Sequence, residues 1–223
     1  SIGPDVPSML AYSAHAYSKI DLPLSQRLMW AWRQGKGKLS DLYFTLTIPS
    51  LLFINHDLPN VPPKLASETL PEYGAVLRAD FGTPRESYLL FKSGIGGARY
   101  HNDEHAFILY LRGVPVTLDG GFGWSTYKGS LHSTVTFDGN DYFMPRGDLA
   151  RFVTLEGADL AVGRMPPSAP HFSRFDRHIL FVKNDYLLIR DDIQSQQATA
   201  WHLPMAVKDI ELGKGQAVGR GRL

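Results

Sequence analysis

The chain has 223 residues, no cysteine and a formal net charge of +1 at pH 7. The lack of cysteine excludes disulfides and thiolate metal sites, and the balanced charge gives no reason to expect nucleic acid as a partner. Hydrophobic residues make up 43% of the chain, as in ordinary globular proteins, and no apolar run reaches the ~20 residues of a membrane span.

Residues 1–58 have a helical pattern. Apolar side chains recur at helical spacing over 8–20, and a second helix is predicted over 23–35, where the final glycine suits a helix end. A further apolar run over 39–53 is interrupted by a proline. Helices this short need partners to bury their apolar faces. We therefore expect more helices upstream, and we interpret the chain as a fragment of a longer polypeptide.

The segment 59–72 contains four prolines, which predicts an extended linker. From residue 73 to residue 223 the pattern changes to short apolar or alternating runs separated by Gly, Pro and Asp. Such runs, with turn signals every ~8–12 residues, are typical of a β-sandwich or barrel. The connections leave no room for crossover helices, so the predicted sheets are antiparallel. Strands are predicted over 74–79 and 87–92, and 175–182 and 185–190 are predicted to form a hairpin across Lys183-Asn184-Asp185.

Histidines and carboxylates are concentrated on or beside three consecutive predicted strands. His101 and Asp103 are two residues apart, so on a strand they would face the same side. Asp119 ends the next strand, and His132 lies on the strand after that. Because neighbouring strands are ~4.8 Å apart, these side chains can converge on one ion.

Two imidazoles and a carboxylate suit Zn²⁺ with a fourth position open. A metal-free network of hydrogen-bonded polar groups at a sheet edge is the alternative. His105, which precedes the apolar run 107–111, is interpreted in three ways: as a metal ligand, as a catalytic group or as a cap of the strand end.

This stretch resembles the C-terminal β-sandwich of heparinase II/III-like polysaccharide lyases. The family pattern is roughly H-x-H-x-D, then F-x-L-Y, G-x-P, D-x-G and later H-N-T-V-x-x-D-G. The residues that carry the resemblance are Arg99-Tyr100-His101-Asn102-Asp103, Phe107-Ile108-Leu109-Tyr110, Gly113-Val114-Pro115, Asp119-Gly120-Gly121, His132-Ser133-Thr134-Val135, Asp138-Gly139, Arg177-His178-Ile179-Leu180 and Trp201-His202.

The resemblance implies a mainly β protein, in which an antiparallel β-sandwich follows the last helices of an incomplete α/α toroid. It also implies cleavage of acidic, uronic-acid-containing polysaccharide by β-elimination. By the same resemblance, His101, Asp119 and His132 would bind a supporting zinc ion. The resemblance further implies that the same polypeptide contains other toroid helices. It also implies a possible homodimer and a periplasmic or secreted location.

The first histidine of the H-x-H pattern is commonly catalytic in the family, and this chain has Arg99 there. Arginine does not accept a proton near neutral pH, whereas its guanidinium can hold a uronate carboxylate. Arg99 is therefore expected to bind substrate, with a solvated loop charge as the alternative. The proton transfer then falls to Tyr100, His105 or a toroid residue. Substrate binding is also expected of the loop aromatics Trp124 and Tyr127.

Two other classes of function compete with the lyase. The chain could be a non-catalytic carbohydrate-binding or structural β-sandwich, which the replacement at Arg99 would allow. It could also be a metal-dependent hydrolase that uses the same histidines. An unsaturated uronate product, which absorbs ultraviolet light, would distinguish the lyase from both.

Overall fold

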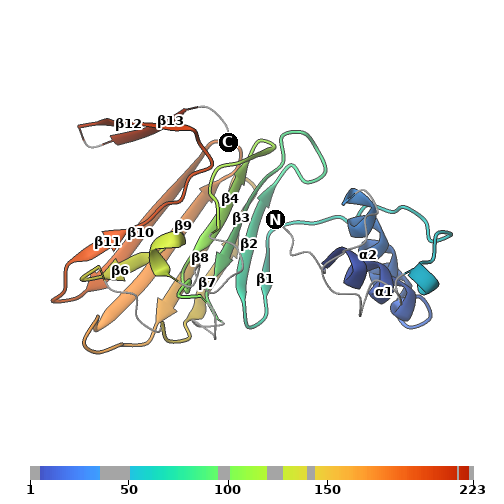
Figure 1. Cartoon of the computed structure of the whole chain (residues 1–223), viewed down its shortest axis with the longest axis horizontal. Coiled ribbons are helices and arrows are strands. Elements are labelled where there is room, and N and C mark those ends of the chain that lie inside the picture. The colour runs from blue at the N-terminus through green and yellow to red at the C-terminus, as the bar shows by residue number, and fades with distance from the viewer. Residues whose placement is uncertain are drawn as a thin grey trace. The chain divides into compact units, whose positions relative to one another are not determined.

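A computed structural model describes residues 6–35, 51–94, 101–119, 128–139, 144–214 and 216–220. The chain divides into two compact units, Ser1–Lys64 and Leu65–Leu223, and each is described by itself (Figure 1). No helix among the described residues is long and apolar enough to cross a membrane.

The first unit is built on an antiparallel pair of helices, α1 (Val6–Tyr17) and α2 (Leu22–Gln34). Asp21 caps α2, because its carboxylate accepts a hydrogen bond from the Leu24 amide at 3.0 Å. The helices are joined by the Ser25 hydroxyl, which donates to the Ala14 carbonyl at 2.5 Å. The buried apolar cluster among the described residues of this unit consists of Ala11, Ala14, Met29, Trp32 and Leu58.

The second unit contains two large antiparallel sheets. The five-stranded sheet has the order β1-β2-β3-β4-β5, with β1 at Glu68–Leu70, β2 at Gly74–Ala79, β3 at Ser87–Lys92, β4 at Phe107–Leu111 and β5 at Val114–Pro115. The four-stranded sheet has the order β10-β9-β8-β7, with β7 at Asp148–Thr154, β8 at Ala158–Met165, β9 at Arg174–Val182 and β10 at Tyr186–Gln194.

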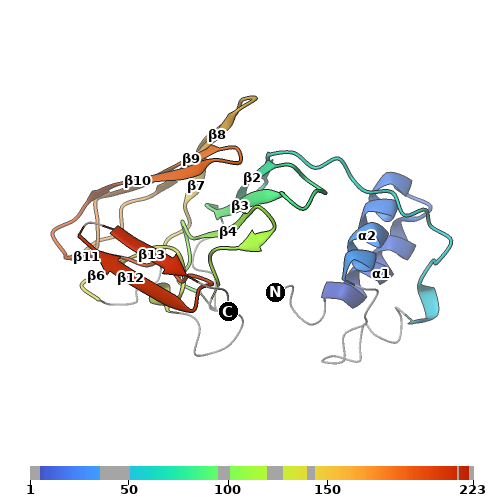
Figure 2. The same cartoon turned by 90° about the horizontal axis from the view of Figure 1, so that it is seen from above.

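The two large sheets pack face to face around a common core. Figure 2 shows β8, β9 and β10 in one layer and β2, β3 and β4 in another. Their inward-facing apolar residues form a single buried cluster of Ala75, Leu77, Ala79, Leu89, Phe91, Phe107, Leu109, Ala161, Ile179 and Phe181. This arrangement confirms the predicted antiparallel β-sandwich preceded by helices.

Two small sheets complete the unit. Strand β6 (Val135–Phe137) pairs with β11 (Thr199–Trp201), and β12 (Asp209–Gly213) pairs with β13 (Gln216–Arg220). A second buried cluster lies beside β6 and consists of Val135, Phe137, Met144, Met165, Phe172 and Phe175. This cluster supports the segment that carries His132.

The structure differs from the expected elements in three places. Strand β1 lies within 59–72, which we expected to be a linker, so the sandwich begins before residue 73. His105 precedes β4 in a left-handed backbone conformation (φ +59°) that ends any regular strand. His132 follows the short 3₁₀ helix Gly129–Leu131 and precedes β6, so it is not on a strand.

Candidate metal centre

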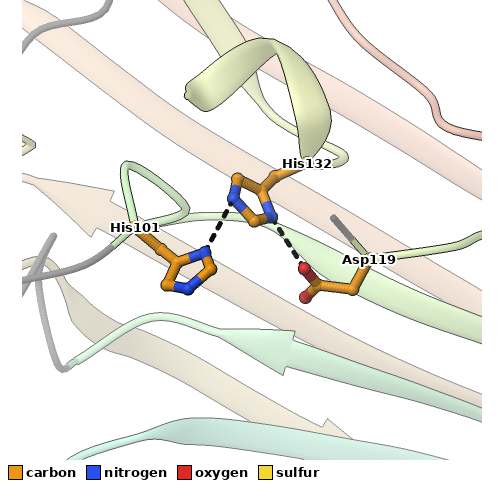
Figure 3. Close-up of side chains that lie close together, drawn as sticks. All are labelled: His101, Asp119 and His132. Atoms are coloured by element: carbon orange, nitrogen blue, oxygen red, sulfur yellow. Dashed lines mark hydrogen bonds and ion pairs between the residues drawn. The ribbon is translucent and has the colours of Figure 1, made fainter. Parts of the chain in front are cut away.

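Three predicted ligands, His101, Asp119 and His132, come together at one place in the second unit. They lie in the segment before β4, the segment after β5 and the turn between the 3₁₀ helix and β6. One ligand atom from each lies within 4.8 Å of the other two. Figure 3 shows the His132 ring between the other two side chains. The predicted convergence is therefore present, although loops rather than strands provide it.

Both ring nitrogens of the His132 imidazole are in contact with the neighbouring side chains of the cluster. Its Nδ1 lies 2.9 Å from Oδ1 of Asp119, and its Nε2 lies 3.2 Å from Nδ1 of His101. The His132 side chain is fully buried, whereas the Asp119 side chain is 38% exposed. The cluster thus reaches from the interior to the surface.

Hydrogen bonds hold the backbone beside two of the three ligands, Asp119 and His132. The amide of Leu118, just before Asp119, donates to the carbonyl of Pro204 at 2.8 Å. The amide of His132 donates to Gly129 at 3.1 Å, and its carbonyl accepts from the Thr134 amide at 2.8 Å. Backbone hydrogen bonds therefore help to position these two ligands.

The donor set fits zinc in chemistry and in size. Zn²⁺ binds imidazole nitrogen and carboxylate oxygen at about 2.0–2.2 Å, which places two ligands of a tetrahedral ion about 3.3 Å apart. The 3.2 Å between Nδ1 of His101 and Nε2 of His132 is close to that separation. Asp119 contacts the other nitrogen of His132, Nδ1, and one imidazole gives only one nitrogen to a given ion. One ligand atom of each residue lies within 4.8 Å of the other two, so these residues would hold a metal once Asp119 and His101 face the same nitrogen of His132. The partly exposed Asp119 would give the site access to solvent.

Asp103, the other carboxylate of the motif, is not part of this group. Its carboxylate forms an ion pair with the ammonium of Lys92 on β3, and both side chains are mostly buried. Asp103 also closes the turn before β4, because its carbonyl accepts from the Ala106 amide at 3.0 Å. Its role is to shape the His101 segment.

Glu104 is a fully buried acid within the segment that begins at His101. Its Oε1 accepts hydrogen bonds from the amides of Gly94 at 2.7 Å and Gly147 at 3.0 Å. Its carbonyl accepts from the Thr134 hydroxyl at 2.9 Å. Glu104 therefore connects the segment before β4 to three other parts of the chain.

The burial of His105 does not support its expected catalytic or metal-binding role. The residue is fully buried, and its ring packs against Phe91 and Phe175 with centroids 5.7 and 5.0 Å away. Neither ring nitrogen has a hydrogen-bond partner among the described residues. Burial, with a smaller effect of the Arg177 charge, lowers the pKa of His105 well below its usual value. The ring is a neutral core group.

The phenol of Tyr73 is affected by the charges of this site. The sequence analysis did not identify Tyr73 as a site residue. Burial raises the pKa of its phenol, and the carboxylates of Asp103, Asp119 and Glu104 raise it further. This environment disfavours the phenolate that a general base requires. Tyr73 is therefore suited to donate a hydrogen bond rather than to accept a proton.

Arg177 on β9 is the other important residue that sequence reasoning missed. It is fully buried, and its guanidinium makes a bidentate ion pair with Asp191, with both N–O distances at 2.7 Å. The sequence did contain a sign of this burial. Arg177 is an even number of residues away from Phe175, Ile179 and Phe181, so on a strand it faces the same side as they do. Strand alternation therefore placed it on the inward face.

Four predicted site residues lie outside the described part of the chain. They are the predicted substrate-binding residues Arg99, Trp124 and Tyr127 and the predicted proton-transfer residue Tyr100. Their roles stay predictions.

The protein is thus a helical unit followed by an antiparallel β-sandwich, which carries a His-Asp-His cluster that reaches from the interior to the surface. Residues 63–220 match the family described as heparinase II/III-like, C-terminal. The chain belongs to this heparinase II/III-like family. A search of curated proteins found no match.

Solved structures agree with this fold. A heparinase III gene product is 18% identical, with a TM-score of 0.62 over 87% of this chain and 31% of its own. The heparan sulfate lyase HepC from Pedobacter heparinus is 17% identical, with a TM-score of 0.53 over 78% of this chain and 28% of its own. The chain thus spans about a third of the length of these proteins.

Proposed function

We propose that this chain is the sandwich portion of a polysaccharide lyase that cleaves an acidic, uronic-acid-containing glycan by β-elimination. The observation that carries the proposal is the convergence of His101, Asp119 and His132 in a chain of the heparinase II/III-like family. We further propose that these residues bind a supporting Zn²⁺, because their donor atoms suit that ion.

The reaction removes the proton on C5 of a uronic acid and breaks the bond from C4 to the glycosidic oxygen. The C5 proton is weakly acidic, so positive or hydrogen-bonding groups must stabilise the charge that develops on the carboxylate. A base takes the proton, and an acid protonates the leaving oxygen. Zinc, when bound, would contribute positive charge and a fixed backbone at this surface.

Within this chain we assign the carboxylate contact to Arg99, whose guanidinium can form two parallel hydrogen bonds to it. Tyr100 is the proposed proton-transfer residue, and Trp124 and Tyr127 are proposed to contact sugar rings. The other groups would come from toroid helices of the same polypeptide. Substrate of this kind suits a periplasmic or secreted protein, and a homodimer stays a prediction.

The test is an assay of the polypeptide that contains this chain on glycosaminoglycans and alginate, followed by ultraviolet absorbance of unsaturated uronate. We expect absorbance to rise, and to rise at least ~10-fold more slowly in His132→Ala. Arg174→Met is the control, because this half-exposed ion-paired side chain on β9 is not among the proposed ligands.

Three results would contradict the lyase. Binding of the glycan without product would favour the carbohydrate-binding sandwich. New reducing ends without ultraviolet absorbance would favour the hydrolase. Neither binding nor product on any uronic-acid glycan would remove the proposed substrate class.

A further inference from the structure

Arg177 connects the two segments that carry the histidines of the candidate metal centre. Its Nη1 donates to the carbonyl of Ser133 at 2.7 Å and to the carbonyl of His105 at 2.6 Å. Ser133 directly follows His132, and His105 closes the short segment that begins at His101. One buried nitrogen thus bonds to both segments, which are far apart in the sequence.

The rest of the guanidinium is fixed from the opposite side. Nε and Nη2 each donate to one carboxylate oxygen of Asp191 on β10 at 2.7 Å. The guanidinium carbon also lies 5.9 and 5.8 Å from the ring centroids of Phe107 and Phe175, within the range of cation–π contacts. The guanidinium is planar and is held on several sides, so it has one orientation. Its position therefore fixes the carbonyls of Ser133 and His105.

The burial of this charge needs a reason. Moving a guanidinium out of water is costly even when it is paired, and a well-packed apolar pair is often as stable or more stable. Arg177 is 0% exposed and lies among apolar residues of both sheets. Two apolar side chains could fill the same volume, but they could not bond to two backbone carbonyls at once. The geometry therefore indicates that the buried Arg177 serves to position the two carbonyls rather than to stabilise the fold.

We propose that Arg177, oriented by Asp191, is the positioning residue of the metal centre. It holds the His101 and His132 segments at the separation that places Nδ1 of His101 3.2 Å from Nε2 of His132. The inference rests on the proposed metal site, and it adds a residue that is not one of the proposed ligands.

The test is zinc affinity, measured by competition with a chromophoric chelator at a temperature where every variant is folded. The main variant is the pair Arg177→Met with Asp191→Leu, which removes both charges and leaves no unpaired carboxylate. We expect it to bind zinc about 10-fold more weakly than the unaltered protein, the usual effect of losing a group that orients a ligand. Arg177→Lys keeps the charge without the planar fork and is expected to lie between the two.

Two control variants separate positioning from stability and from charge. Ile179→Ala removes a fully buried side chain two residues along β9, and Arg174→Met removes a charge from the same strand. Both are expected to bind zinc within about twofold of the unaltered protein. Equal weakening in Ile179→Ala would mean that Arg177 acts only through stability, which would overturn the inference.

Hydrogen exchange of the metal-free proteins gives a second, independent readout. We expect faster exchange in 101–107 and 132–137 of the Arg177 variants, with β2 and β3 unchanged. Unchanged exchange in both segments, or unchanged zinc affinity in a folded variant, overturns the positioning role. If the unaltered protein binds no zinc, the proposed metal site fails, and exchange alone decides whether Arg177 holds the segments. If the double variant does not fold, Arg177→Lys decides both measurements.

Discussion

Nδ1 of His101 lies 3.2 Å from Nε2 of His132, although 31 residues separate them in the chain. Their rings meet edge to face with centroids 5.1 Å apart. Two imidazole nitrogens at this distance share one hydrogen, so one ring donates and the other accepts. A metal ion can replace that hydrogen and use both lone pairs, which is why the pair is informative about the site.

The first prediction concerns metal content. The purified protein is expected to contain about one zinc ion per chain, and His101→Ala or His132→Ala to contain none. Either substitution leaves two ligands, and an ion bound by only two ligands would be lost during purification. Elemental analysis after gel filtration measures the ratio. His15→Ala, in the helical unit, is the control and should keep the metal.

Acid should release the same ion. Metal ligands must be deprotonated, so zinc competes with protons for the two imidazoles. Zinc that stays fully bound after dialysis at a pH well below the ordinary histidine pKa of about 6.5 would argue against these ligands.

The second prediction concerns the space above His105. Gly163 on β8 has no side chain, and an added Cβ would lie 2.6 Å from Ser93 Oγ and 2.7 Å from both His105 Nε2 and Phe91 Cζ. Gly163→Ala is therefore expected to lower the free energy of unfolding by ~1–3 kcal/mol through overpacking. Gly157→Ala is the control, because an added Cβ there meets nothing within 4 Å. Equal denaturation midpoints for the two variants would contradict this account.

The third prediction concerns pH. The folded protein keeps His105 neutral because burial lowers its pKa, whereas the unfolded chain titrates near pH 6.5. Below about pH 6.5 the unfolded state therefore binds a proton that the folded state does not. Stability falls by up to ~1.4 kcal/mol per pH unit until the lowered pKa is reached, and the residue adds no pH dependence above 6.5.

Urea denaturation at pH 7.5, 6.0 and 5.0 measures this slope. His105→Asn removes the titrating group, and asparagine tolerates the positive φ of this position. The variant should be less stable at pH 7.5 and should lose less stability on acidification. Parallel curves for the two proteins would show that His105 does not contribute to the slope.

The fourth prediction concerns the hydrogen bond from the buried Thr134 hydroxyl to the Glu104 carbonyl at 2.9 Å. Thr134→Val keeps the shape of the side chain and removes the donor, so the buried structure loses this hydrogen bond. We expect a loss of ~1–3 kcal/mol in thermal or urea unfolding. Thr69→Val, on the exposed face of β1, should change stability by less than ~0.5 kcal/mol.

Elements bounded by turn residues were predictable from the sequence. The predicted strands 74–79 and 87–92 agree with β2 and β3, because alternating side chains and flanking Gly, Pro and Asp mark their ends. Strand β10 extends to Gln194, beyond the predicted end at residue 190. The extension depends on pairing with Arg174–Arg177 of β9, a tertiary effect that local pattern does not contain.

The candidate site was predictable in composition but not in detail. The motif identified His101, Asp119 and His132. The local pattern placed His132 on one strand and His105 at the start of another, the strand that ends at residue 111. A 3₁₀ turn and a left-handed backbone at His105 changed both orientations. Arg177 was missed because a charged residue is usually read as exposed, even where the strand's alternation points inward.

The pairing of β6 with β11 affects the order in which the site can form. The Thr136 hydroxyl lies 2.8 Å from Nε2 of His202, 66 residues later in the chain, and β11 is the strand that pairs with β6. During synthesis from the N-terminus, all three ligands leave the ribosome well before residue 199 does. Until β11 is made, the strand that follows His132 lacks its partner. Zinc present at that stage would encounter ligands whose positions are not yet fixed by this pairing.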